Sequence, residues 1–391
     1  MESTGAGRGA GPFDVDLARL RRRRTVKWSL YGPDVLAAWV AEMDFDVAPP
    51  VRDALLAAVA REDFGYVPAD LTELTTACAA FLDATTGWQV PPSRVFPVAD
   101  VLTGIAAAID LYSPPGTAVV VPTPAYPPFF DVVALTGRPV DEAPMVLERG
   151  RWCLDVERID RHLAAGARTV LLCSPHNPTG RVFRADELDA LAEVVERHGA
   201  RVVADEVHAP LVATGVRHAP YASVGDAAAD HAVTITSASK AWNLAGLRCA
   251  QVIASNHDDA AAWRRLPLFA VHGPTPLGIA ASTAAYHDGG DWLLALRGRL
   301  DENRRLLDGL LRSELAGVTW HGAEATFLAW LDCAPLGFAD PARQFLDHGR
   351  VALSDGPPFG AGWEQHVRLN LGTSSELLER IVAAIARSLA A

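Results

Sequence analysis

Lysine is nearly absent from this sequence. Of its 391 residues 35 are basic, and all of these are arginine except Lys27 and Lys240. Arginine stays protonated in proteins and cannot form the carbon–nitrogen double bond that a lysine amine forms with an aldehyde. If the protein performs chemistry of that kind, the sequence offers two residues for it.

Close cysteine pairs, positive net charge and long apolar runs are also lacking. The five cysteines are scattered, so we expect neither a disulfide framework nor a metal site. The net charge of −12 disfavours nucleic acids and anionic membranes as partners. No apolar run approaches the roughly 20 residues of a membrane span. Residues 1–12 lack an apolar signal core, so we expect a cytoplasmic protein.

Half of the residues are hydrophobic, as in a packed globular protein, and from about residue 95 short apolar runs alternate with amphipathic helices. This alternation predicts an α/β fold with a mostly parallel central sheet and helices on both faces. Ligands of such sheets bind beyond the carboxyl ends of the strands. Strands are predicted at 118–121, 169–173, 201–204, 231–236 and 248–254, and a helix at 186–198.

After about residue 285 the pattern changes to that of a smaller α+β domain. It predicts a long helix at 292–314, strands at 325–331, 351–353 and 366–371, and helices at 341–348 and 375–389. We expect residues 1–48 to form an N-terminal arm and part of the small domain. Residues 49–285 would form the large domain, and residues 286–391 the small C-terminal domain.

Polar runs follow several of the predicted strands. Thr-Ser-Ala-Ser-Lys at 236–240 places hydroxyls beside an amine, which suits an anion site next to a reactive lysine. Two further runs end upstream strands, Asp-Glu-Val-His at 205–208 and Ser-Pro-His-Asn-Pro-Thr-Gly at 174–180. Arg248 and Arg368 follow downstream. Each run alone has an ordinary structural explanation, such as a turn or a helix cap.

In this order and spacing, the runs resemble the fold-type I pyridoxal-phosphate enzymes of the class I/II aminotransferase family. The resemblance extends from about Lys27 to the C-terminus. Within the family, Lys27-Trp28, the run 39–45 (Trp-Val-Ala-Glu-Met-Asp-Phe), the run 64–66 (Phe-Gly-Tyr) and the run 327–332 (Phe-Leu-Ala-Trp-Leu-Asp) are similar to the MalY/PatB group of cystathionine β-lyase-like C–S lyases.

The resemblance implies pyridoxal 5'-phosphate as cofactor, bound by the large domain. Lys240 would bind the cofactor aldehyde and later move the proton at the substrate Cα. Asp205 would pair with the pyridinium nitrogen, and Tyr126 would stack on the ring. Asn177 and His208 would form hydrogen bonds near the phenolic oxygen. Many family members carry tyrosine at the position of His208, which leaves the exact partner of this side chain open.

The resemblance also implies a site for the cofactor phosphate. The side chains of Ser237, Ser239 and Arg248 would hold the phosphate. The backbone N–H groups of Val101 and Leu102, at the start of a predicted helix, would add a dipole-assisted anion site.

The remaining roles concern the substrate and a second subunit. Arg368 would bind the substrate α-carboxylate through its planar fork, together with Asn177. Trp39 and Asp44 would line the substrate entrance. Tyr66 would reach across the interface of a homodimer to the phosphate of the neighbouring subunit, so that the active sites are shared.

The favoured reaction is β-elimination from cystathionine or a cysteine S-conjugate, which gives a thiol, pyruvate and ammonia. Three alternatives stay open: transamination with a 2-oxo acid, another cofactor-dependent path on an S-substituted cysteine in secondary metabolism, and a non-catalytic regulator that retains the fold. The intact set of Lys240, Asp205 and Arg368 argues for catalysis.

The sequence generates one direct test of the cofactor assignment. Lys240→Ala should abolish the visible absorbance band of the cofactor-loaded protein near neutral pH and nearly all turnover, because the remaining lysine, Lys27, lies outside the strand-end runs. Absorbance spectra and a product assay measure both effects. A variant that kept the band and the activity would contradict the assignment.

Overall fold

The computed structural model describes residues 13–267 and 273–389. Residues 1–12, on which the expected absence of a signal sequence rests, lie outside the described residues. Among the described residues no helix is both long enough and apolar enough to span a membrane.

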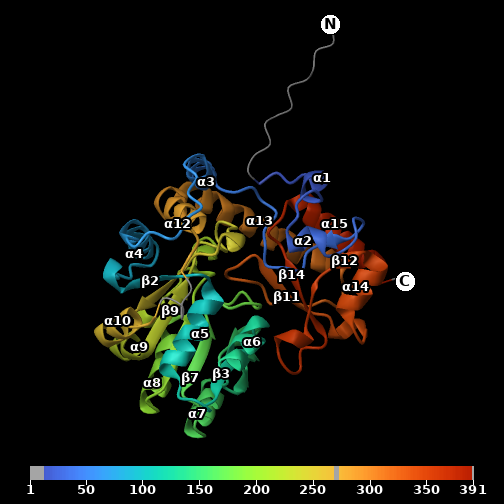
Figure 1. Cartoon of the computed structure of the whole chain (residues 1–391). Helices are drawn as coiled ribbons and strands as arrows, with labels where there is room; N and C mark the ends of the chain where they lie inside the picture. Colours follow the sequence, from blue (N-terminus) through green and yellow to red (C-terminus); the bar gives the residue numbers. More distant parts are fainter. Residues whose placement is uncertain (1–12, 268–272, 390–391) are drawn as a thin grey trace.

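A seven-stranded sheet forms the centre of the larger part of the molecule (Figure 1). Its buried strands are rich in β-branched residues, as is typical of a sheet covered on both faces. All neighbouring strands are parallel except β10, which is antiparallel to both of its neighbours. The predicted α/β fold is confirmed. The order is β2 (Val95–Val98), β10 (Ala250–Ala254), β9 (Ala232–Thr236), β8 (Arg201–Asp205), β7 (Thr169–Cys173), β3 (Val119–Thr123) and β4 (Val140–Pro144).

Helices cover both faces of this sheet because successive strand residues point to opposite sides. One face packs against α7 (Val156–Ala164), α8 (Ala185–Arg197) and α9 (Asp226–His231). The other face packs against α5 (Val101–Tyr112), α6 (Pro128–Leu135) and α10 (His257–Arg264). Gly104 lets α5 approach the sheet closely: a Cβ atom there would lie 3.1 Å from Val252 Cγ2 and 3.3 Å from Ile235 Cγ2.

The C-terminal part contains a three-stranded antiparallel sheet in the order β11 (Leu328–Asp332), β14 (His366–Asn370), β13 (Ser354–Asp355). Its helices are α13 (Gly290–Glu314), α14 (Pro341–Gly349) and α15 (Ser375–Ser388). The strand β11 begins later than the sequence predicts. Thr326 adopts a positive φ of 68°, and its N–H donates to Leu211 O, so the chain is not extended there.

The N-terminal residues lie against this C-terminal part, as Figure 1 shows for α1 (Leu17–Leu20) and α2 (Val26–Ser29). The short strand β1 (Leu36–Ala37) pairs in parallel with β12 (Val351–Ala352). The chain then crosses to the larger part through α3 (Pro49–Ala60) and α4 (Thr72–Thr86), which both pack on α12 (Pro276–Asp288). The residues between β1 and α3 therefore run past the carboxyl edge of the central sheet.

Candidate functional site

A cavity of about 220 Å³ lies at the carboxyl edge of the central sheet. It brings together residues that are far apart in the sequence. Lys240 and every predicted cofactor ligand except Tyr66 line it: Val101, Leu102, Tyr126, Asn177, Asp205, His208, Ser237, Ser239 and Arg248.

The strand directions explain this convergence. Tyr126, Asn177, Asp205 and Ser237 stand at or just after the ends of β3, β7, β8 and β9, which are parallel. Because β10 runs in the opposite direction, its beginning lies at the same edge, and Arg248 is two residues before that beginning. The antiparallel direction of β10 thus places Arg248 at the edge where the parallel strands end.

The Lys240 amine faces the cavity and donates a hydrogen bond of 3.1 Å to Ala41 O. Loss of hydration, with a smaller contribution from the positive charge of Arg368, lowers the pKa of Lys240 to about 8. The carboxylates of Asp205 and Glu42 act in the opposite direction. A lysine in this environment is partly unprotonated near neutral pH, as a proton-accepting amine requires.

The Asp205 carboxyl is buried at the end of β8, where its Oδ1 atom accepts a 3.0 Å hydrogen bond from Val207 N. Burial, with a smaller contribution from the neighbouring Glu206, raises the pKa of Asp205 to about 7. The Val207 hydrogen bond and the Lys240 charge lower it. Such a carboxyl is suited to pair with a cationic group that enters the cavity.

Arg368, on β14, is buried beside the cavity and contacts Asn177 from β7. Its Nη1 atom donates to Asn177 Oδ1 at 3.0 Å, and Nη2 donates to Trp39 O and Ser354 Oγ, both at 3.1 Å. The guanidinium carbon lies 5.0 Å from the centre of the Phe359 ring. Loss of hydration lowers the pKa of Arg368 to about 10. The arginine is therefore oriented by several fixed partners.

Polar atoms without partners indicate that the cavity fits a polar ligand. Among the described residues, His208 Nδ1 and Arg368 Nε are buried and have no hydrogen-bond partner. Buried polar groups are normally paired, so these atoms are available to a bound molecule. His208 lines the cavity, and burial lowers its pKa well below the usual value, which leaves the ring neutral.

The opposite end of the cavity fits an anion. Arg248 and Ser239 line it, and α5 begins there with Asp100 as its cap: Asp100 Oδ1 accepts from Thr103 N at 2.8 Å. The other oxygen of Asp100 pairs with Arg248 at 2.8 Å, so the capping carboxylate and the arginine offset one another. The Ser237 hydroxyl donates to Cys249 O at 2.6 Å. These groups fit a phosphate, provided that the Ser237 hydroxyl turns toward it.

Two of the predicted residues lie elsewhere. Tyr66 is fully exposed beside a separate cavity of about 840 Å³ between α3 and α12. Asp44, expected at the substrate entrance, is buried instead, and its carboxylate forms an ion pair with Lys27. That expectation, which rested on the family resemblance, is wrong because Lys27 draws the Asp44 carboxylate into the interior. Trp39 approaches the site through its backbone carbonyl, which accepts from Arg368.

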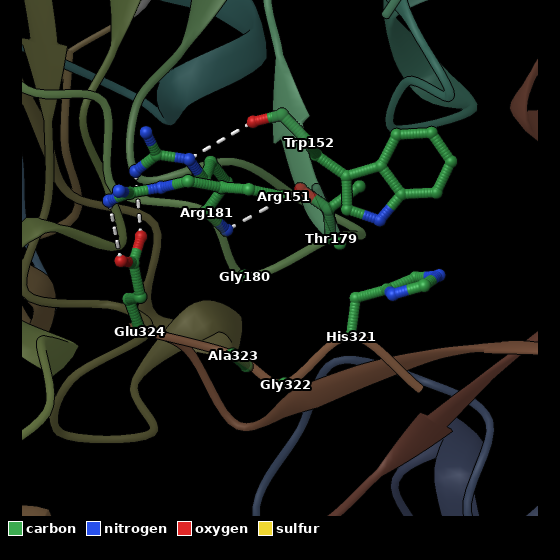
Figure 2. A pocket seen from close by; sticks show the side chains of 10 residues that line it. Arg151, Trp152, Thr179, Gly180, Arg181, His321, Gly322, Ala323 and Glu324 are labelled. Atoms are coloured by element: carbon green, nitrogen blue, oxygen red, sulfur yellow. Dashed lines mark hydrogen bonds and ion pairs between the residues drawn. The ribbon is translucent and has the colours of Figure 1, made fainter. Parts of the chain in front are cut away.

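Sequence reasoning missed the contacts that fix the turn carrying Asn177. In a third cavity, of about 410 Å³ and shown in Figure 2, Glu324 accepts from Arg151 Nη2 at 2.9 Å and from Arg181 Nη1 at 2.7 Å. The backbone N–H of Glu324 also donates to Gly180 O at 2.9 Å. These contacts hold the turn against the C-terminal part. Nothing in the local sequence pairs a glutamate with arginines more than 140 residues away.

The raised pKa of Asp205 generates a prediction about stability. A carboxyl with a pKa of about 7 in the folded state and 3.8 as its ordinary value binds more protons when folded, so it destabilises the fold increasingly as the pH rises from about 4 to about 7. In protein free of cofactor, Asp205→Asn should therefore gain stability relative to wild type over this interval, by on the order of 3 kcal/mol. Denaturant unfolding at several pH values measures the difference. A difference that stays constant with pH would contradict the prediction.

Comparison with known proteins agrees with the geometry. Residues 36–385 match the family described as aminotransferase class I and II. Cystathionine β-lyase from Corynebacterium glutamicum is 38% identical, with 95% of this chain and 98% of that protein covered. Cystathionine β-lyase PatB from Bacillus subtilis is 33% identical, with 95% and 99% covered. The aspartate aminotransferase of Bacillus subtilis is 25% identical, with 91% of each chain covered.

A crystal structure from Corynebacterium diphtheriae, provisionally assigned as a pyridoxal-phosphate-dependent β-cystathionase, superposes with a TM-score of 0.93. It is 39% identical and covers 97% of this chain and 100% of its own. The predicted resemblance is confirmed across nearly the whole length. The chain belongs to the class I and II aminotransferase family.

Proposed function

We propose that the protein is a pyridoxal-phosphate-dependent carbon–sulfur lyase that acts on cystathionine or a related S-substituted cysteine. With one water consumed, the Cβ–S bond breaks, and the products are a thiol, pyruvate and ammonia. The observation that carries the proposal is the single cavity in which the Lys240 amine, the Asp205 carboxyl and the unpartnered His208 nitrogen face one another, with Arg368 beside them.

The cofactor supplies an electron-withdrawing ring that accepts the electron pair left on the substrate Cα. Lys240 would hold the cofactor aldehyde and would accept the proton from the substrate Cα, for which an amine with a pKa of about 8 is suited. Asp205 would pair with the ring nitrogen and so favour its protonated form. The buried site strengthens this pairing because no water competes for the carboxylate.

The other residues orient the cofactor and the substrate. Tyr126 would cover one face of the ring, while Asn177 and His208 would donate near the phenolic oxygen. Arg368 binds the substrate α-carboxylate with Asn177, and Trp39 lies at the substrate side. The phosphate is held by the groups at the opposite end of the cavity: Ser237, Ser239, Arg248 and the N–H groups of Val101 and Leu102.

The choice of elimination over transamination is supported by the relatives. The proteins named as cystathionine β-lyases are 33% and 38% identical to this chain, whereas the aspartate aminotransferase is 25% identical. The physical requirement is a leaving group on Cβ, and a thiolate departs far more readily than hydroxide or an alkyl group. Elimination also needs no amino acceptor, whereas transamination requires a 2-oxo acid in every cycle.

The two reactions differ in their need for an acceptor, and this difference provides the test. The purified enzyme, given cystathionine or an S-alkyl cysteine and no 2-oxo acid, should release thiol and pyruvate over many turnovers. Thiol and pyruvate assays against enzyme concentration measure this. If release stops after one equivalent per subunit and resumes only when a 2-oxo acid is added, the protein is a transaminase.

We further propose that the enzyme is a homodimer in which Tyr66 contacts the phosphate bound by the neighbouring subunit. Tyr66 is fully exposed in the single chain, and Phe64, two residues before it, is 59% exposed. Aromatic side chains are enriched at protein–protein interfaces, which supports an interface at this place.

Shared active sites predict complementation between two inactive variants. Mixed dimers of Tyr66→Phe and Lys240→Ala subunits carry one site with both defects and one site with neither. Activity should therefore partly return when the two variants are unfolded and refolded together, compared with each variant refolded alone. The absence of any recovery, or a monomer at the assay concentration, would exclude a shared site.

A further inference from the structure

Lys27, the second of the two lysines, forms a buried ion pair outside the cavity. Its Nζ atom lies 2.9 Å from Asp44 Oδ1, and each side chain is 1% exposed. The same carboxylate oxygen accepts a 2.8 Å hydrogen bond from Trp28 Nε1. The residues of two separate sequence runs, Lys27-Trp28 and 39–45, thus meet in one cluster.

The two lysines donate to neighbouring carbonyls of one short segment. Lys240 Nζ donates to Ala41 O at 3.1 Å, and Lys27 Nζ donates to Glu42 O at 2.8 Å. Lys27 approaches from the N-terminal arm and Lys240 from the loop after β9, so the segment lies between them.

Every carbonyl of the segment 39–43 accepts a hydrogen bond from a side chain. The donors come from β14, from the loop after β9, from Lys27 and from Ser354 on β13, whose hydroxyl donates to Trp39 O at 2.6 Å. In order along the chain, Trp39 O accepts from Arg368, Val40 O from Asn370, Ala41 O from Lys240, Glu42 O from Asn370 and Lys27, and Met43 O from Asn243. The segment therefore connects the amine and the arginine of the cavity to the buried ion pair.

A buried ion pair contributes little net stability, because the loss of hydration offsets the attraction between the charges. A buried ion pair instead fixes the local geometry, because removing either partner would leave a buried charge without its counter-charge. Here the pair fixes Glu42, the direct neighbour of the residue that receives the Lys240 amine, and Asp44, whose N–H donates to Gly372 O at 2.8 Å.

We infer that Lys27, paired with Asp44, is a positioning residue for the reaction. It fixes the segment 39–43, and through Ala41 O and Trp39 O it fixes the Lys240 amine and the Arg368 guanidinium. The inference rests on the proposed function for the roles of Lys240 and Arg368. It does not depend on whether the reaction is elimination or transamination, because both begin with the same substrate binding and the same proton removal.

The decisive variant is Lys27→Met/Asp44→Asn. Methionine fills the space of the lysine stem, and the asparagine oxygen still accepts from Trp28 Nε1, so the fold is preserved while the ion pair is lost. The control is Arg19→Met. Arg19 forms an ion pair of 2.8 Å with Asp46 that joins the same two stretches of chain, but its side chain is 56% exposed.

Two readouts separate positioning from stability. The first is the affinity of the loaded enzyme for L-alanine, which binds without a leaving group, read from the shift of the visible absorbance band. The double variant should bind L-alanine at least tenfold more weakly and have a lower kcat, whereas Arg19→Met should match wild type. The second is amide hydrogen exchange of residues 39–44 in cofactor-free protein, which should become faster in the double variant only.

Asp44→Asn alone is the milder second variant and should shift both readouts in the same direction if the double variant does not fold. If the variants lower the melting temperature but leave L-alanine affinity, kcat and the exchange of residues 39–44 within twofold of wild type, Lys27 is merely structural and the inference is overturned. Failure of the proposed function is distinguishable, because wild type would then show no sustained release of thiol, while the exchange experiment still reports on the segment.

Discussion

Loss of hydration at Lys240 and Asp205 is the constraint on which the site depends. Burial lowers the pKa of the amine to about 8 and raises that of the carboxyl to about 7. The two groups, which would differ widely in water, thereby come to titrate near neutrality, where protons can be exchanged at small cost. Because water is excluded from such a site, its charged groups must be stabilised by fixed dipoles of the protein. The carbonyl of Ala41, the N–H of Val207 and the ends of the strands supply them.

The fold supplies these groups from three separate parts of the chain. The central sheet contributes the residues after β3, β7, β8 and β9, and the reversed strand β10 adds Arg248 at the same edge. The C-terminal strand β14 contributes Arg368, which meets Asn177 from β7. The segment 39–43 runs between these parts and binds both. A substrate carboxylate bound by Arg368 would therefore be positioned relative to Lys240 through the backbone carbonyls of Trp39 and Ala41, which are two residues apart.

The features that the sequence predicted correctly are those that depend on residues close together in the chain. Buried strands such as 169–173, and helices with a capping residue or proline at the start, were found close to their observed bounds, and the polar residues after the strands converge as expected. The direction of β10 was not predictable, because β10 is as fully buried as the parallel strand β9 beside it. The burial of Asp44 and the contacts of Glu324 depend on residues distant in sequence, namely Lys27 and Arg181. Neither leaves a periodic signal in the chain.

The two lysines face different kinds of acceptor. Lys27 Nζ lies 2.9 Å from the Asp44 carboxylate. Lys240 instead donates to a neutral carbonyl, Ala41 O, which holds the nitrogen in place without a full opposing charge. A carboxylate in direct contact with Lys240 would raise its pKa above about 8, since the more distant carboxylates of Asp205 and Glu42 already act in that direction. The segment 39–43 thus contacts Lys240 through a backbone carbonyl, whereas the ion pair is formed by Lys27, which holds the segment in place.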